Sequence, residues 1–170
     1  MASTYTGLGT QLMTTGEKAG TWGTLTNTNW NIMEQISGGY TVQTLNTDGT
    51  GANTTTLAVS DGSAGATLAN KVIILGAESA QAITGNKIVT FPTDTEGLKV
   101  VFNGTTGAYT VQLKGASDSG SGTTFTTTSK DKKLVYMSGT DLVEIVTGTV
   151  TASSTTTFTN KTFTAPKYAD

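Results

Sequence analysis

Threonine constrains the fold of this chain more than any other residue type, because 39 of its 170 residues are threonine. The branched Cβ of threonine restricts the χ1 torsion, which favours extended strands over helices. Another 21 residues are glycine, and most of them stand at turn positions between short alternating runs. The combination predicts many short strands joined by tight turns.

A strand pattern begins at Tyr40 and continues to Val146. It contains about eight short runs, at the spacing that is typical of all-β domains. Because no long helix separates these runs, a parallel sheet with helical crossovers is not expected. We therefore expect a mainly β fold, in which residues 40–148 form an antiparallel β-sandwich or jelly-roll-like domain.

Two hairpins are expected within this region. Leu98–Phe102 and Tyr109–Lys114 alternate on either side of a glycine-containing turn, and the alternation places the side chain of Tyr109 on the inward face. Residues 133–146 contain the second pair of runs, which turn at Ser138–Asp141. Both pairs predict neighbouring antiparallel strands.

Residues 1–39 differ from the rest, because they contain both tryptophans and a helical pattern of apolar side chains over residues 25–37. Asn27 or Thr28 can serve as the N-cap, by accepting a hydrogen bond from a free amide of the first turn. In Ser37–Gly39, a glycine can adopt the left-handed conformation that ends a helix. A helix of about ten residues is marginal alone in water, so it must pack against the following domain or another chain.

The aromatic and apolar side chains of this N-terminal arm are the best candidates for a contact with another protein. Buried aromatic side chains are typical interface anchors, and no catalytic or metal-binding residue accompanies the tryptophans. The alternative is that the tryptophans seal the end of the core of the β domain. The candidate docking residues are Trp22, Trp30, Ile32, Met33 and Ile36.

Residues 149–170 form a third region, which we expect to be an extended tail. It contains few side chains of core size, and Thr157–Thr159 recurs as Thr162–Thr164. Its aromatic side chains need partners, which three chains packed around a common axis would supply. The alternatives are that the tail folds back on its own domain or is disordered. The candidate trimer contacts are Phe158, Phe163 and Tyr168.

The composition excludes several kinds of site. Without histidine or cysteine, the chain can form neither a Ser-His-Asp triad nor a zinc-type centre. The net charge is -2 and all ten basic residues are lysine, which argues against nucleic acid as a partner. No run of about 18 apolar residues is present, so membrane insertion is not expected. We predict no metal, no cofactor and no enzymatic activity.

Paired carboxylates are the one catalytic arrangement that this composition leaves open. The possible pairs are best interpreted as solvated side chains in or beside turns, where carboxylates bond to the local backbone. They are Asp94 with Glu96, Asp118 with Asp131, and Asp141 with Glu144.

Thr15–Gly39 resembles the N-terminal segment of bacteriophage tail-fibre-like virion proteins of the marine podophage and cyanophage type. The expected hairpins are similar to β modules of the same proteins, and Thr157–Asp170 is similar to the repeat that often leads into their distal part. The N-terminal pattern is the more specific one. It is carried by Gly16-Glu17, Gly20–Gly23, Asn27, Asn29-Trp30 and Ile36.

The resemblance implies a homotrimeric, non-enzymatic structural protein of the virion, located in the phage tail and assembled in the host cytoplasm. Its N-terminal part would attach to other virion proteins, either of the adaptor or nozzle type in the tail or in the capsid. The protein would support adsorption to the host receptor, and a host surface glycan would be bound by parts beyond this chain. Two alternatives stay open. One is a head decoration or capsid-fibre protein, and the other is a carbohydrate-binding β-sandwich with Tyr109 and Tyr136 as candidate sugar contacts.

Overall fold

The computed structural model describes residues 3–46, 53–77, 82–117 and 122–146. In this part of the chain the fold is mainly β, with one α-helix, one 3-10 turn and strands in three sheets, which confirms the expected fold class. The elements are β1 (Thr4–Tyr5), β2 (Gln11–Leu12), α1 (Trp22–Gly38), β3 (Tyr40–Leu45), β4 (Thr54–Thr56), η1 (Thr67–Ala69), β5 (Val72–Ala77), β6 (Lys87–Phe91), β7 (Glu96–Asn103), β8 (Val111–Gly115), β9 (Thr123–Phe125), β10 (Lys132–Ser138) and β11 (Leu142–Glu144).

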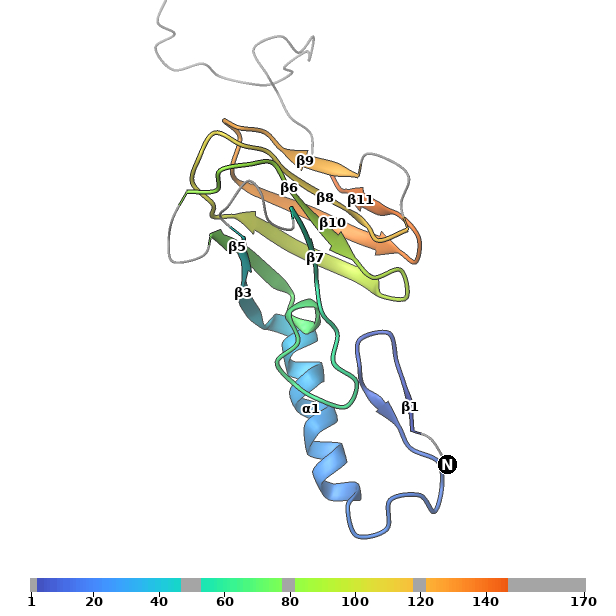
Figure 1. The fold of residues 1–170 in the computed structure, drawn as a ribbon. Helices are drawn as coiled ribbons and strands as arrows, with labels where there is room; N and C mark the ends of the chain where they lie inside the picture. Colours follow the sequence, from blue (N-terminus) through green and yellow to red (C-terminus); the bar gives the residue numbers. More distant parts are fainter. Residues whose placement is uncertain (1–2, 47–52, 78–81, 118–121, 147–170) are drawn as a thin grey trace, which may run out of the picture.

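The N-terminal part extends from one end of the larger sheets (Figure 1). α1 runs almost directly into β3, and the antiparallel pair β1–β2 lies beside the helix. The segment that connects β4 to β5 and carries η1 runs along α1 and contacts it. The helix is therefore held between the hairpin and a connection of the β domain.

α1 is longer than the sequence pattern predicts. It begins at Trp22, because the carbonyl of Lys18 accepts a hydrogen bond from the amide of Trp22 at 3.1 Å. The N-cap is Thr21, whose side chain makes no capping bond. The prediction of an N-cap at Asn27 or Thr28 is therefore wrong, and the helix includes the first tryptophan.

The end of α1 also differs from the expectation. Gly39 has φ -66° and ψ 152°, which is extended rather than left-handed backbone. A Cβ atom at this position would lie 2.6 Å from Oδ1 of Asn70 and 2.8 Å from Cα of Gln35. Close packing, rather than a left-handed turn, therefore requires glycine here.

The two larger sheets share the chain in an alternating way, since consecutive strands from β3 to β8 lie in opposite sheets. The five-stranded sheet has the order β11-β10-β7-β5-β3, and the four-stranded sheet has the order β4-β6-β8-β9. The pairs β3–β5, β5–β7, β4–β6 and β6–β8 are all parallel. The strand pairs β3 and β4, β5 and β6, and β7 and β8 thus form three successive turns of the chain. Each turn places one strand in each sheet, parallel to the strand of the turn before it. β9, β10 and β11 then complete the sheets with antiparallel pairs.

The expected antiparallel arrangement is therefore wrong for the central strands, and so is the first expected hairpin. β7 and β8 lie in different sheets. Oδ1 of Asn103 accepts hydrogen bonds from the amide and hydroxyl of Thr105, at 3.1 Å and 2.7 Å. The amide of Gly104 donates to the carbonyl of Leu75 at 2.9 Å. These bonds lead the chain across to the other sheet, and local alternation alone does not distinguish such a crossover from a hairpin.

Tyr109 lies in this crossover and not in a strand, and its side chain is 38% exposed. The prediction that it points inward is therefore wrong. The second expected hairpin is confirmed, because β10 and β11 pair antiparallel and the amide of Ser138 donates to the carbonyl of Asp141 at 3.1 Å. Gly139 has φ 102°, a conformation that favours glycine in this turn.

The core lies between the two larger sheets, because one cluster of buried side chains draws on the inward face of both. Phe91 and Phe125, both from the four-stranded sheet, are its largest members. The five-stranded sheet contributes Leu45, Ile73, Leu75, Val101, Val135, Met137 and Leu142, and the four-stranded sheet also contributes Val89, Val111 and Leu113.

Candidate functional site

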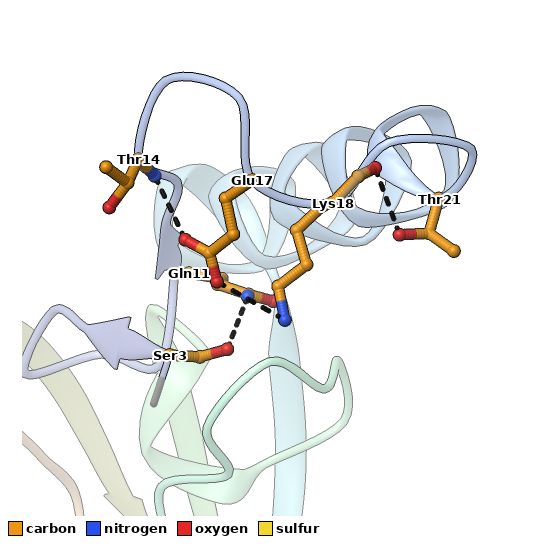
Figure 2. Close-up of polar contacts among 6 residues, drawn as sticks. All are labelled: Ser3, Gln11, Thr14, Glu17, Lys18 and Thr21. Carbon is orange, nitrogen blue, oxygen red and sulfur yellow. Dashed lines mark hydrogen bonds and ion pairs between the residues drawn. The ribbon is translucent and has the colours of Figure 1, made fainter. Parts of the chain in front are cut away.

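The loop before α1 sets the position of Trp22. Figure 2 shows the carboxylate of Glu17 accepting a hydrogen bond from the amide of Thr14, at 3.2 Å, beside the ammonium of Lys18. The Thr14 bond and the Lys18 charge lower the pKa of Glu17. The carbonyl of Lys18 accepts from both the amide and the hydroxyl of Thr21, at 3.0 Å and 3.2 Å. This turn leads directly into the helix and fixes where its first residue lies.

The middle of α1 is fastened to β2 by an amide side chain. Oδ1 of Asn29 accepts a hydrogen bond from the amide of Gln11, and Nδ2 of Asn29 donates to the carbonyl of Gln11, both at 2.9 Å. The side chain of Gln11 in turn donates to the hydroxyl of Ser3 at 3.0 Å (Figure 2). The helix and the hairpin are thus held together by polar groups with paired donors and acceptors.

The C-terminal turn of α1 is fastened to the β domain. The carbonyl of Gln35 accepts the amide of Lys71 at 3.2 Å, and Oε1 of Gln35 accepts the amide of Gly65 at 3.1 Å. Ile32 lies on the same side of the helix and is 0% exposed. Tertiary packing, rather than its own propensity, therefore stabilises this helix.

Three of the five candidate docking residues form an exposed stripe along α1. Trp22 is 64% exposed, Trp30 61% and Met33 46%. At about 100° per residue, these three positions fall within about 80° of each other around the helix axis. We call Trp22, Trp30 and Met33 the aromatic stripe. Two large aromatic side chains and a flexible thioether are therefore exposed along one stripe of the helix.

The other two candidates belong to the inner face of the helix. Ile32 is buried and Ile36 is half-buried, so Ile32 contributes to the fold of this chain and offers no surface to a partner. The alternative role for the tryptophans is also wrong for the described residues, because neither indole seals a core. At about 100° per residue, Ile32 and Ile36 lie on the flank next to the aromatic stripe, and Asn29 lies between the two sets.

In the described part of the chain, hollows lie on two sides of α1. The first, of about 360 Å³, lies between the β1–β2 turn, Ile36, Asp94 of the β6–β7 turn and Glu96 at the start of β7. The second, of about 480 Å³, lies beside the last turn of the helix. A Cβ atom on Gly7 would lie 2.1 Å from the carbonyl oxygen of Asp94, so the hairpin backbone packs directly against the β6–β7 turn. Asp94 and Glu96 are both exposed at the rim.

The remaining carboxylate candidates are dispersed or occupied. Glu144 forms an ion pair with Lys133 at 2.7 Å and accepts a hydrogen bond from Thr123. Asp141 is exposed in the β10–β11 turn, and Asp118 lies outside the described residues. Within the described ranges, no three acidic side chains converge to form a site that could hold a metal ion.

The residues predicted for sugar binding and for trimer contacts do not form a site within the described residues. Tyr136 lies on β10 and Tyr109 in the β7–β8 crossover, so the two do not form a row on one sheet face. The described chain includes no helix long and apolar enough to cross a membrane. The candidate trimer contacts Phe158, Phe163 and Tyr168 lie outside the described residues.

Comparisons of the chain with protein-family models, with curated proteins and with solved structures find no match. The function is therefore inferred from the arrangement of residues in this chain. Sequence reasoning identified the aromatic stripe but missed the pairing of Asn29 with Gln11. The available signal was an asparagine, a weak helix former, on the apolar stripe of the helix between Leu25 and Ile32.

Proposed function

We propose that this chain is a non-enzymatic structural component of a phage virion, of the tail-fibre type, and that the aromatic stripe of α1 docks it to another virion protein. One observation carries the proposal: Trp22 and Trp30 are both more than half exposed on a helix that is fastened to its own domain. Tryptophan is one of the residues that are enriched among interface anchors. A soluble chain rarely exposes two indoles on one helix without a partner for them.

The way in which α1 is held supports this role. The hydrogen bonds of Asn29 to Gln11 and of Gln35 to Lys71 fix the helix before any partner binds. Docking would then cost little ordering entropy, because the anchors are already in place. Since α1 projects beyond the larger sheets, it can enter a partner while the β domain stays outside (Figure 1).

The partners that this role implies are two further copies of the chain and a tail protein of the adaptor or nozzle type. In the tail, the protein would support adsorption to the host receptor. A head decoration or capsid-fibre protein would use the same anchors on a capsid partner. A sugar-binding module is not favoured, because Tyr109 and Tyr136 do not share a face.

The test is incorporation into phage particles. The double variant Trp22→Ala, Trp30→Ala removes two exposed side chains and should lower the amount of this protein in purified particles at least about tenfold, as the loss of interface anchors does. The matched control is Asn31→Ala, Glu34→Ala, which changes two exposed polar residues of the same helix. Incorporation of the double tryptophan variant at the wild-type level would contradict the docking role. Gold labelling of intact particles would then distinguish tail from head.

A further inference from the structure

The outer face of the five-stranded sheet is apolar, although the same sheet already buries its inner face in the core. The register aligns Tyr40, Val72, Val100 and Leu134 in one row across four strands, all on the side opposite the core. None of these side chains is buried. When one face of a sheet meets water, the side chains on that face are normally polar and those on the core face apolar. An apolar row on the outer side is therefore unusual.

The rows of side chains on either side of this row are also apolar, so the apolar side chains form a patch across the sheet. Together with the row above they form what we call the outer face. The flanking rows are Val42, Ile74 and Phe102 on one side, and Leu98, Tyr136 and Val143 on the other.

Among the described residues, charged side chains stand only at the two ends of this outer face. Lys132 lies opposite Phe102 at one end, and Glu96 lies opposite Ser138 at the other. Both are exposed. An apolar centre with a polar rim is the usual anatomy of a protein–protein interface.

We infer that the outer face is the surface by which this chain associates with two further copies of itself around a threefold axis. The inference rests on the homotrimer of the proposed function and assigns its interface. A face without central charges requires a partner without charges, because an unpaired charge buried against it would be strongly unfavourable. The central rows of the same face on another copy meet that requirement.

The width of the sheet suits threefold closure. Strands lie about 4.8 Å apart, so the four spacings of a five-stranded sheet span about 19 Å. Three such sheets, standing as the sides of a triangular prism, would each lie about 5.5 Å from its axis. Facing sheets pack about 10 Å apart, so each side-chain layer fills about 5 Å. The outward side chains of three copies would therefore fill the interior of the prism.

The experiment measures the oligomeric state of the full chain by sedimentation velocity. Leu98→Lys and Tyr136→Lys, made separately, each place a charge on the outer face at positions that are 36% and 38% exposed in one chain. We expect a wild-type trimer and, for each variant, an assembly midpoint raised at least about 100-fold. The control Thr124→Lys adds the same charge at an exposed position of the four-stranded sheet and should leave the trimer intact.

A second measurement uses the absence of native cysteine. Leu98→Cys should form disulfide-linked pairs between copies under oxidation, whereas Thr124→Cys should not. This readout does not depend on whether a charged variant folds well.

The outcomes separate the inference from the proposed function. A wild-type monomer or dimer overturns both the homotrimer and the interface. A wild-type trimer that survives Leu98→Lys and Tyr136→Lys overturns the interface alone. If the full chain with Phe158, Phe163 and Tyr168 replaced by serine is a monomer while the sheet variants are trimers, the tail forms the trimer contact and the inference is wrong.

Discussion

The side chain of Asn29 makes two hydrogen bonds with the main chain of Gln11, one as acceptor and one as donor, both at 2.9 Å. Gln11 lies in β2 and pairs with Tyr5 in β1, so the asparagine binds the free edge of a two-stranded sheet. A two-stranded hairpin is marginal alone in water. The amide of Asn29 thus lets the helix stabilise the hairpin, and the hairpin keep the helix in place.

We expect Asn29→Asp to weaken this attachment. The carboxylate has the shape of the amide and can still accept from the Gln11 amide, but it cannot donate to the Gln11 carbonyl and faces it with negative charge. The free energy of unfolding should fall by about 1–3 kcal/mol. Urea denaturation measures this loss, and hydrogen exchange should show faster exchange at Gln11. Asn31→Asp, at an exposed position of the same helix, is the control and should change stability by less than about 0.5 kcal/mol.

Truncation should cost much more stability at the buried side chain of α1 than at its exposed tryptophans. Ile32→Ala removes a fully buried side chain and should cost about 2–4 kcal/mol of unfolding free energy. Trp22→Ala and Trp30→Ala remove exposed side chains and should each cost less than about 1 kcal/mol in the isolated chain. Thermal denaturation measures all three variants. A large loss for either tryptophan would show that it packs within its own chain and would remove it from the aromatic stripe.

The exposure of the tryptophans has a direct optical consequence. Each single-tryptophan chain, Trp22→Phe or Trp30→Phe, should show red-shifted emission that acrylamide quenches strongly, because the remaining indole is in contact with water. Blue-shifted emission that resists quenching in the purified chain would contradict the exposed placement.

The sequence predicts a mainly β chain with one N-terminal helix, because threonine content and apolar period are local properties. It predicts the β10–β11 hairpin for the same reason, since its turn is short and contains Gly139. It does not predict that β7 and β8 lie in different sheets. That depends on how Asn103 bonds to Thr105, and on the Gly104 bond to a strand about thirty residues away, which no alternation pattern encodes.

The candidate site was predicted in part for similar reasons. The apolar spacing of α1 identifies a helix, but apolar residues on adjacent stripes cannot be assigned to core or surface without knowing what packs against them. Ile32 and Met33 are neighbours in sequence, yet one is buried and the other exposed. The bonds of Asn29 to Gln11, a partner 18 positions earlier, and of Gln35 to Gly65 and Lys71 hold the helix in this orientation.

Glu144 should stabilise the fold at neutral pH and lose this effect in acid. Partial burial raises the pKa of Glu144, but hydrogen bonds from Lys133 and Thr123, with the Lys133 charge, outweigh it and leave the pKa lowered. The pKa of Glu144 is therefore lower in the folded chain than in the unfolded chain, where it is about 4.3. The carboxylate stabilises the fold above about pH 4.3, and this stabilisation is lost as pH falls through the pKa of the folded state. Glu144→Gln should therefore cost about 1 kcal/mol at pH 7 and almost nothing near pH 3.

Urea denaturation of Glu144→Gln and wild type, between pH 7 and pH 3, measures this difference. Asp141→Asn, at an exposed position in the adjacent turn, is the control. A difference between Glu144→Gln and wild type that is the same at every pH would contradict the ion pair with Lys133.

Lys99 places a cation on the inward face of β7, where its neighbours along the strand are Val101 and Asn103. Burial, with the nearby charge of Lys71, lowers its pKa to about 8. The unfolded chain has a pKa of about 10.4 at this position. Between these two values the unfolded chain binds a proton that the folded chain does not, so stability rises as pH rises from about 8 to about 10.4.

At neutral pH the charge on Lys99 therefore opposes folding, and Lys99→Met should raise the free energy of unfolding by roughly 1–3 kcal/mol at pH 7. Methionine matches the aliphatic part of lysine in length and needs no solvation, so packing should be kept. The advantage over wild type should shrink steadily as pH increases towards about 10. Urea denaturation at pH 7, 8, 9 and 10 measures it, with the exposed Lys132→Met as control. A stabilisation that does not change with pH would mean that side-chain packing, rather than the buried charge, produces it.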